Sequence, residues 1–218
     1  MKTRILGYTT GALAAGFLVY ILCTFLSSER FAERLRHPAM EECGFTCSEL
    51  AIINGADSIL RVLTIEKPCD LAVLRTQSSD FSSETLLSEE FERLSDLMIA
   101  TVTHPSQDGV GIAGPQVGLN RRVVAVQRFD KEDEPFEFYP NIRIVWKSDS
   151  LEFGPEGCLS VPDRRENVAR SQEIVIEYTI VPELESVRDT ISGFTAVIFQ
   201  HEVDHLNGVL YIDRVGHR

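Results

Sequence analysis

His201, Glu202 and His205 form a His-Glu-x-x-His pattern close to the C-terminus, and these residue types at this spacing can bind a metal ion and transfer protons. Residues four apart lie on one face of a helix, so both imidazoles can reach one metal ion. Glu202 follows the first histidine, where a carboxylate can hold and deprotonate a metal-bound water. The bare pattern also arises by chance, in which case both histidines would be hydrogen-bonded core residues. Apolar neighbours favour the metal, because a buried polar pair has to be satisfied.

A catalytic metal site needs a third protein ligand, for which cysteine is the natural candidate. Four of the five cysteines lie in an apolar leader, in a predicted linker or after a turn proline: Cys23, Cys43, Cys47 and Cys69. Cys158 lies in a bend rich in glycine and proline, 153–162, where backbone amides could point into a cleft. Taken alone, Cys158 has an equal alternative as a small buried thiol that fills space.

The segment 109–118 contains four glycines and one long polar side chain, Gln116. A nucleotide-phosphate loop is disfavoured, because no Gly-Lys-Ser/Thr follows and no strand and helix flank the segment. A loop dense in glycine allows a substrate backbone to approach closely, and a side-chain amide can donate to developing negative charge. The sequence therefore predicts a substrate-binding loop with Gln116 aimed at the reacting group.

Hydrophobic periodicity predicts the elements that position these residues. Ser88, two following glutamates and a helical apolar spacing predict a helix over 88–103. A second, buried helix starts near Thr190 or Ser192, ends at Gly208 and carries the histidines. Segments rich in β-branched and aromatic residues predict strands over 59–64, 121–129, 136–146 and 172–181. The expected fold is α+β, with mainly antiparallel sheets around the histidine-bearing helix.

Composition excludes several classes of protein. The chain has 218 residues, 44% hydrophobic and 25% charged, which suits one globular domain with an appendage and excludes wholesale disorder. Its net charge of −12 disfavours a direct nucleic-acid partner, because phosphate binding needs a basic surface. Five scattered cysteines are too few for a disulfide framework.

The N-terminal part differs in composition from the rest of the chain. Residues 5–28 are uncharged and mostly apolar, and a helix of that length reaches about 36 Å, enough to cross a membrane. We therefore expect an apolar leader and N-terminal helix at 1–28, a linker at 29–58 and a catalytic domain at 59–218. The expected localisation is membrane-associated through a single N-terminal span, with a cleaved or lipidated export signal as the alternative.

Three segments in order, GVGIAGPQ, EGCLS and QHEVDH, resemble the signature motifs of peptide deformylases. The similarity extends over roughly residues 59–214. The resemblance implies hydrolytic removal of the formyl group from the N-terminal formyl-methionine of new polypeptides, with formyl-methionyl peptides and nascent chains as partners. Because such chains are made in the cytosol, the catalytic domain is expected to face it.

The resemblance also implies residue roles. Cys158, His201 and His205 would hold one divalent metal ion, usually Fe²⁺, with Zn²⁺, Ni²⁺ or Co²⁺ as substitutes, and Glu202 would act as general base and then general acid. The Gln116 side chain and the backbone N–H of Leu159 would bind the developing oxyanion. Other residues would lie near the peptide or shape the methionine pocket: Val110, Gly111, Glu156, Arg165, Phe194, Val197 and Ile198.

The chain departs from the family pattern at Gly114, where the family usually has alanine, and only 13 residues follow His205. Two other functions remain open: a zincin-type metallopeptidase, for which only Asp213 and His217 could supply a downstream ligand, and a membrane-tethered, non-catalytic peptide-binding relative. The sequence predicts neither the oligomeric state nor the native metal.

Overall fold

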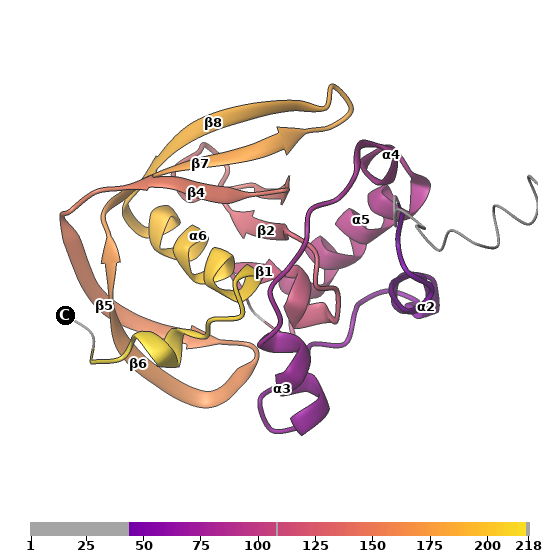
Figure 1. Ribbon diagram of the computed structural model, residues 1–218. Coiled ribbons are helices and arrows are strands. Elements are labelled where there is room, and N and C mark those ends of the chain that lie inside the picture. The colour runs from indigo at the N-terminus through magenta and orange to yellow at the C-terminus, as the bar shows by residue number, and fades with distance from the viewer. Residues whose placement is uncertain (1–43, 108, 217–218) are drawn as a thin grey trace, which may run out of the picture. The chain divides into compact units, whose positions relative to one another are not determined.

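The computed structural model describes residues 44–107 and 109–216, a mixture of helices and antiparallel sheets (Figure 1). The helices are α2 (Cys47–Gly55), α3 (Pro68–Leu74), α4 (Ser83–Leu86), α5 (Glu89–Thr103) and α6 (Gly193–Leu206), with short 3-10 helices η1 (Gly114–Val117) and η2 (Tyr211–Arg214). The strands are β1 (Gly111–Ala113), β2 (Val123–Gln127), β3 (Phe136–Pro140), β4 (Arg143–Lys147), β5 (Leu151–Cys158), β6 (Val161–Ser171), β7 (Glu173–Ile180) and β8 (Glu185–Ser192).

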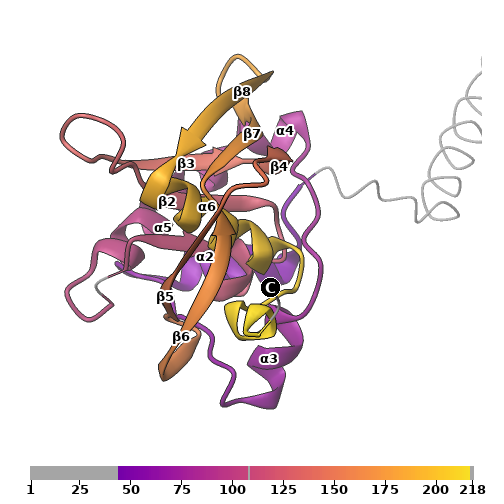
Figure 2. The ribbon, with the colours of Figure 1, turned by 90° about the vertical axis from the view of Figure 1, so that its left-hand side faces the viewer.

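The described residues form three antiparallel sheets, with strand orders β1-β2-β3, β4-β7-β8 and β5-β6. Helix α6 contacts strands of all three. In Figure 1 it lies beneath β4, β7 and β8 and beside β1 and β2, and in Figure 2 the β5–β6 hairpin lies on the side of α6 that faces the viewer. A helix surrounded in this way presents side chains to several strands at once, which is what a site assembled from distant segments requires.

Strand β2 separates two hydrophobic cores. Val123 and Ala125 pack into the core that contains α5, whereas Val124 and Val126 pack into the core that contains α6. Successive side chains of a strand point to opposite faces, so a strand covered on both faces is apolar at every position. The first sheet is therefore held between α5 and α6, and the position of α6 is fixed by packing on more than one side.

The two predicted helices are confirmed, since α5 follows the N-cap Ser88 and α6 ends at Leu206. The predicted strand 59–64 is wrong: its backbone N–H groups bond the Thr101 hydroxyl and the carbonyl of Gln116 instead of a neighbouring strand. The predicted strand 136–146 is divided into β3 and β4 at Asn141, whose φ of 55° interrupts extended backbone.

The predictions for the N-terminal part are in part wrong and in part fall outside the described residues. Within residues 44–107 and 109–216, no helix is long and apolar enough to cross a membrane. This finding corrects the predicted membrane localisation with a single N-terminal span, and the stretch 5–28 on which it rested lies outside the described residues, as does the predicted apolar N-terminal helix. Part of the predicted linker 29–58 forms α2, and its Ile53 is fully buried in the core with α5. The domain boundary at residue 59 stays a prediction.

Gly114 replaces the alanine that is usual in the motif this segment resembles. Close backbone contacts explain why glycine is found there. A Cβ at this position would lie 2.7 Å from the carbonyl oxygen of Arg121 and 2.8 Å from that of Leu119. Gly114 also accepts a hydrogen bond from the Leu119 N–H, so the two segments are held together there. Alanine does not fit unless the backbone moves.

We therefore expect Gly114→Ala to lower the free energy of unfolding by about 1–3 kcal/mol, the usual effect of forcing extra volume into a packed region. Urea unfolding followed by circular dichroism measures it. Gly154→Ala is the matched control, because a Cβ at Gly154 meets nothing within 4 Å. The control should change stability by no more than about 0.5 kcal/mol. Equal stability of the two variants would contradict the steric explanation.

Candidate metal centre and substrate cleft

Three side chains that can bind a metal converge where β5 ends against α6. Cys158 is the last residue of β5, and His201 and His205 lie one turn apart on α6. The Cys158 Sγ lies 3.2 Å from His205 Nε2, and the three potential ligand atoms all lie within 4.8 Å of one another. A thiolate and two imidazoles form a donor set that suits a divalent transition metal such as Zn²⁺ or Fe²⁺. The predicted ligands are thus brought together.

The charges of this cluster favour the ligand form of the cysteine. Burial raises the pKa of the Cys158 thiol, but the charges and hydrogen bonds of His205 and His201 outweigh burial, and the pKa falls well below its usual range. Burial lowers the pKa of His201, whereas its hydrogen bonds with Cys158 and Glu156 raise it more. The cluster therefore stabilises a thiolate, which is the form that binds metals.

Glu156 fixes the orientation of His201. Its Oε2 lies 2.7 Å from His201 Nδ1, which leaves the other ring nitrogen directed to the cluster. Arg170 on β6 donates to both Glu156 oxygens, at 2.7 and 3.0 Å. Burial raises the pKa of Glu156, but the hydrogen bonds from His201 and Arg170 bring it down to about 2. Glu156 is therefore an anion that holds a histidine of the candidate metal site, an arrangement that fixes the histidine tautomer.

Arg170 also contacts α6 itself. Its Nη1 donates to Asp204 Oδ2 at 2.6 Å, and Asp204 further accepts from Arg214 at 2.7 Å. Sequence reasoning missed both Arg170 and Asp204. Asp204 offered a signal, because an acid on a buried helix between two histidines needs a partner. Arg170 offered none, since it lies on a strand that the sequence did not predict.

Glu202 is buried beside the two histidines. Its Oε2 has no hydrogen-bond partner among the described residues. Burial raises the pKa of Glu202 to about 7, against the lowering effect of His201 and His205. A Cβ on Gly111 would lie 2.6 Å from Glu202 Oε1, so glycine allows β1 to approach this carboxylate closely. A buried carboxylate with a free oxygen and a pKa near neutrality is suited to proton transfer.

Gln116 is held with its amide directed toward the cysteine. Its Oε1 accepts from the Ala113 N–H at 2.8 Å, and its Nε2 donates to Ser160 Oγ at 3.3 Å and to Cys158 Sγ at 3.5 Å. The first bond makes the assignment of oxygen and nitrogen unambiguous, because only the oxygen can accept. Leu159 follows Cys158 in the turn between β5 and β6. Both predicted oxyanion donors therefore lie next to the cysteine.

A cleft of about 730 Å³ opens beside the cluster. Its lining contains every predicted substrate-binding residue: Val110, Gly111, Glu156, Arg165, Phe194, Val197 and Ile198. Cys158, His201, Glu202, Gln116 and Leu159 also line it. The sequence analysis missed other members of the lining, among them Gln107, Asp163 and Arg164. The exposed ring of Phe194 packs on Phe129, with ring centroids 5.3 Å apart, which gives the rim an apolar edge.

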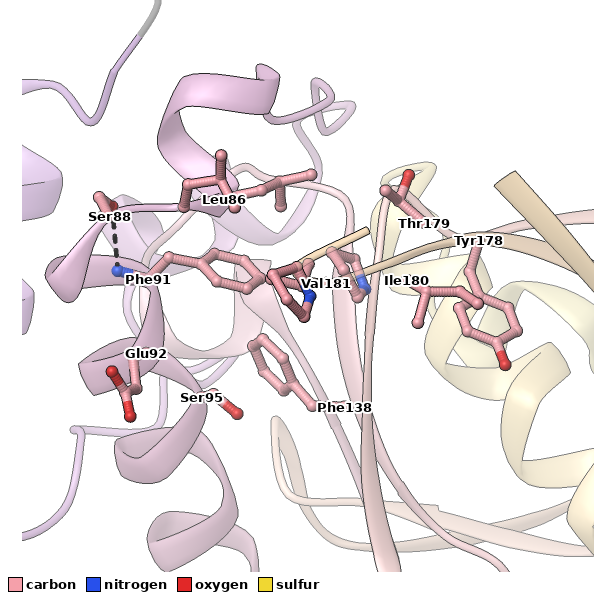
Figure 3. Close-up of a pocket in the computed structure, with 13 residues that line it drawn as sticks. Leu86, Ser88, Phe91, Glu92, Ser95, Phe138, Tyr178, Thr179, Ile180 and Val181 are labelled. Atoms are coloured by element: carbon pink, nitrogen blue, oxygen red, sulfur yellow. Dashed lines mark hydrogen bonds between the residues drawn. The ribbon is translucent and has the colours of Figure 1, made fainter. Parts of the chain in front are cut away.

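A separate apolar pocket of about 430 Å³ lies between α5 and the end of β7 (Figure 3). Figure 3 shows the rings of Phe91 and Phe138 pointing toward Val181, with Leu86 nearby. None of the predicted metal, catalytic or substrate-binding residues lines this pocket. The predicted chemistry therefore gathers in the cleft beside the cysteine and histidines.

Comparison with known proteins shows which family the chain belongs to. A family model described as polypeptide deformylase matches residues 59–218. Peptide deformylase 2 of Vibrio cholerae is 35% identical over 156 residues, covering 72% of this chain and 86% of the relative. A Met-Ala-Ser-bound structure of the class I type b peptide deformylase from Acinetobacter baumannii has a TM-score of 0.64 at 34% identity and covers 73% of this chain and 100% of its own. The Thermotoga maritima peptide deformylase has a TM-score of 0.63 at 32% identity, covering 72% of this chain and 98% of its own. The chain therefore belongs to the polypeptide deformylase family, metal-dependent hydrolases that remove the formyl group from nascent peptides.

Proposed function

We propose that Cys158, His201 and His205 hold one divalent metal ion and that Glu202 is the general base and acid of deformylation. The proposal rests on one observation above all: three ligand atoms within 4.8 Å of one another lie beside a buried carboxylate whose Oε2 has no partner among the described residues. Fe²⁺ is the proposed ion, with Zn²⁺, Ni²⁺ or Co²⁺ as alternatives that the same donor set accepts. A divalent ion held there would supply a water acidic enough to act as the nucleophile near neutral pH, because such an ion lowers the pKa of bound water toward about 7.

The chain's own residues then account for the remaining steps. Glu202 takes the proton as the water oxygen bonds to the formyl carbon, and later gives it to the leaving amine as the C–N bond breaks. The Gln116 amide and the Leu159 backbone N–H donate to the formyl oxygen as it gains negative charge, and one such donor is typically worth about 3–4 kcal/mol. The products are formate and a peptide with a free N-terminus.

The cleft supports a peptide substrate with an apolar first side chain. Val110, Phe194, Val197 and Ile198 line it and are proposed to enclose the methionine side chain, while Gly111 and Arg165 are proposed to contact the peptide. The Acinetobacter relative was solved with Met-Ala-Ser bound, which supports the same class of ligand here. Glu156 is proposed to act through His201 and not by touching the peptide, because both of its oxygens are occupied by His201 and Arg170.

A zincin-type peptidase is a poorer match to the same residues. Its third ligand would have to come from beyond α6, where Asp213 pairs with Arg75 and accepts from the Leu210 N–H. His217 lies outside the described residues. Formate release from formyl-Met-Ala by anaerobically purified protein, together with metal analysis of the same sample, tests the proposed activity. Release of an amino acid in place of formate would favour the peptidase.

Glu202→Gln should retain the metal and lose deformylation, because the amide keeps the shape of the side chain but cannot accept the proton. We expect kcat to fall by about 10²–10⁴-fold, the usual contribution of a general base. Formate release and metal content measured on one preparation check both parts. A variant that keeps more than about a tenth of the wild-type kcat would show that another group takes the proton.

Cys158→Ala should lose bound metal, because two imidazoles alone leave the site without its thiolate. Metal content after anaerobic purification is the measurement, with Cys47→Ala as the control because Cys47 is exposed and outside the cleft. Full metal occupancy in Cys158→Ala would remove this residue from the ligand set.

Glu156→Gln should weaken metal binding by about 10–100-fold, the usual effect of losing a carboxylate that holds a metal-binding histidine. Competition with a chelator measures the affinity. Glu152→Gln is the matched control, since Glu152 is an exposed glutamate on the same strand. If both variants bind the metal as the wild type does, Glu156 does not position His201.

A further inference from the structure

A cavity of about 330 Å³, outside the catalytic cleft, is lined by basic side chains although the chain is acidic. It lies where β4, the last turn of α6 and η2 meet. Its lining consists of Gln77, Arg122, Arg143, Ile144, Lys147, Val203, Asp204, Asn207 and Arg214. Four of these nine side chains are cationic, and Asp204 is the one acid among them. We call this cavity the basic pocket.

Arg122 is the buried cation of the basic pocket, with 6% of its surface exposed. Its Nε donates to the Ile142 carbonyl and its Nη1 to Asn207 Oδ1, both at 3.0 Å. Among the described residues no carboxylate lies within ion-pair distance of it, whereas Arg121 next to it pairs with Glu49. Burial and the charge of Arg143 lower the pKa of Arg122, the charge of Asp80 partly offsets them without forming an ion pair, and an arginine stays charged. A buried charge without a counter-ion is unfavourable.

The other charges of the basic pocket do not compensate for Arg122. Asp204 pairs with Arg170 and Arg214, and Arg143 pairs with Asp80 outside the pocket. Lys147 is exposed and forms no ion pair within the described part of the chain, although the charge of Asp204 partly offsets the lowering of its pKa by burial. Arg122 and Lys147 are therefore two cations without a paired carboxylate among the described residues, in a cavity large enough for a small molecule.

We propose that the basic pocket binds a phosphate dianion, either inorganic phosphate or the phosphate group of a small phosphomonoester. A dianion matches the two cations that lack a paired carboxylate, and guanidinium groups bind phosphate oxygens in a fixed, directional geometry. Arg122 and Arg143 supply guanidinium donors, and Lys147 supplies a point charge. The cavity volume leaves room beside the phosphate for a small organic part, such as a sugar.

Isothermal titration calorimetry of the metal-loaded full-length protein with inorganic phosphate, at constant ionic strength set with chloride, tests the proposal. We expect saturable binding that Lys147→Gln weakens by at least about tenfold, equivalent to about 1.4 kcal/mol. Lys67→Gln, which removes an exposed lysine outside the basic pocket, should bind as the wild type does. Arg143→Gln is a second test variant, because Arg143 is also exposed and its loss leaves Arg122 in place.

Each outcome decides the proposal. Loss of affinity in Lys147→Gln and Arg143→Gln but not in Lys67→Gln supports it. Binding that all three variants retain would locate phosphate elsewhere, for example at the metal, and equal weakening in all three would indicate non-specific attraction. Absence of saturable binding at millimolar phosphate would also overturn it. Titration with ribose 5-phosphate in place of phosphate shows whether the organic part adds affinity. None of these measurements uses deformylation, so failure here leaves the proposed function untouched.

Discussion

Arg170 lies between two carboxylates that belong to different parts of the fold, Glu156 on β5 and Asp204 on α6, and is itself nearly completely buried. Through Glu156 the guanidinium determines how His201 is held, and through Asp204 it determines where α6 lies against the β5–β6 hairpin. Cys158 ends the same strand that carries Glu156. The contacts of Arg170 therefore link the strand that carries the cysteine to the helix that carries the histidines, in addition to the hydrophobic packing of α6.

Such a contact constrains the sequence strongly. Removing one member of a buried ionic group leaves the other charges without partners, which typically destabilises a protein by about 3–5 kcal/mol. Arg170 has 4% of its surface exposed, and Glu156 and Asp204 are similarly buried, so water cannot replace a lost partner. The three residues are better understood as a support that fixes ligand geometry than as a source of stability, because burying charges is itself costly.

How far the sequence predicts this molecule depends on whether the signal is local. The α5 cap at Ser88 and the periodicity of α6 are local, and both helices were predicted. The cleft residues were found because three short segments resemble a known family, not because their spacing shows that they meet. The segment 59–64 alternates like a strand, yet its N–H groups bond Thr101 and Gln116, and it pairs with none of the described strands. Helix α2 did carry a local signal, the reciprocal Thr46–Glu49 capping box, within a segment interpreted as a linker. Arg170 could not be predicted, since its partners lie 14 and 34 residues away.

Asp204 lies between the cysteine–histidine cluster, where negative charge favours a cation, and the basic pocket, where positive charge favours an anion. On one side, Asp204 accepts from Arg170, which also bonds Glu156, and Glu156 in turn holds His201. Thiolate and carboxylate groups there provide negative charge suited to a cation. On the other side, Asp204 and Arg214 line the basic pocket, where Arg122 and Lys147 leave positive charge suited to an anion. Because Asp204 is already shared by two arginines, it cannot also neutralise Arg122. The ion pairs that Asp204 forms beside the candidate metal centre thus leave Arg122 without a paired carboxylate.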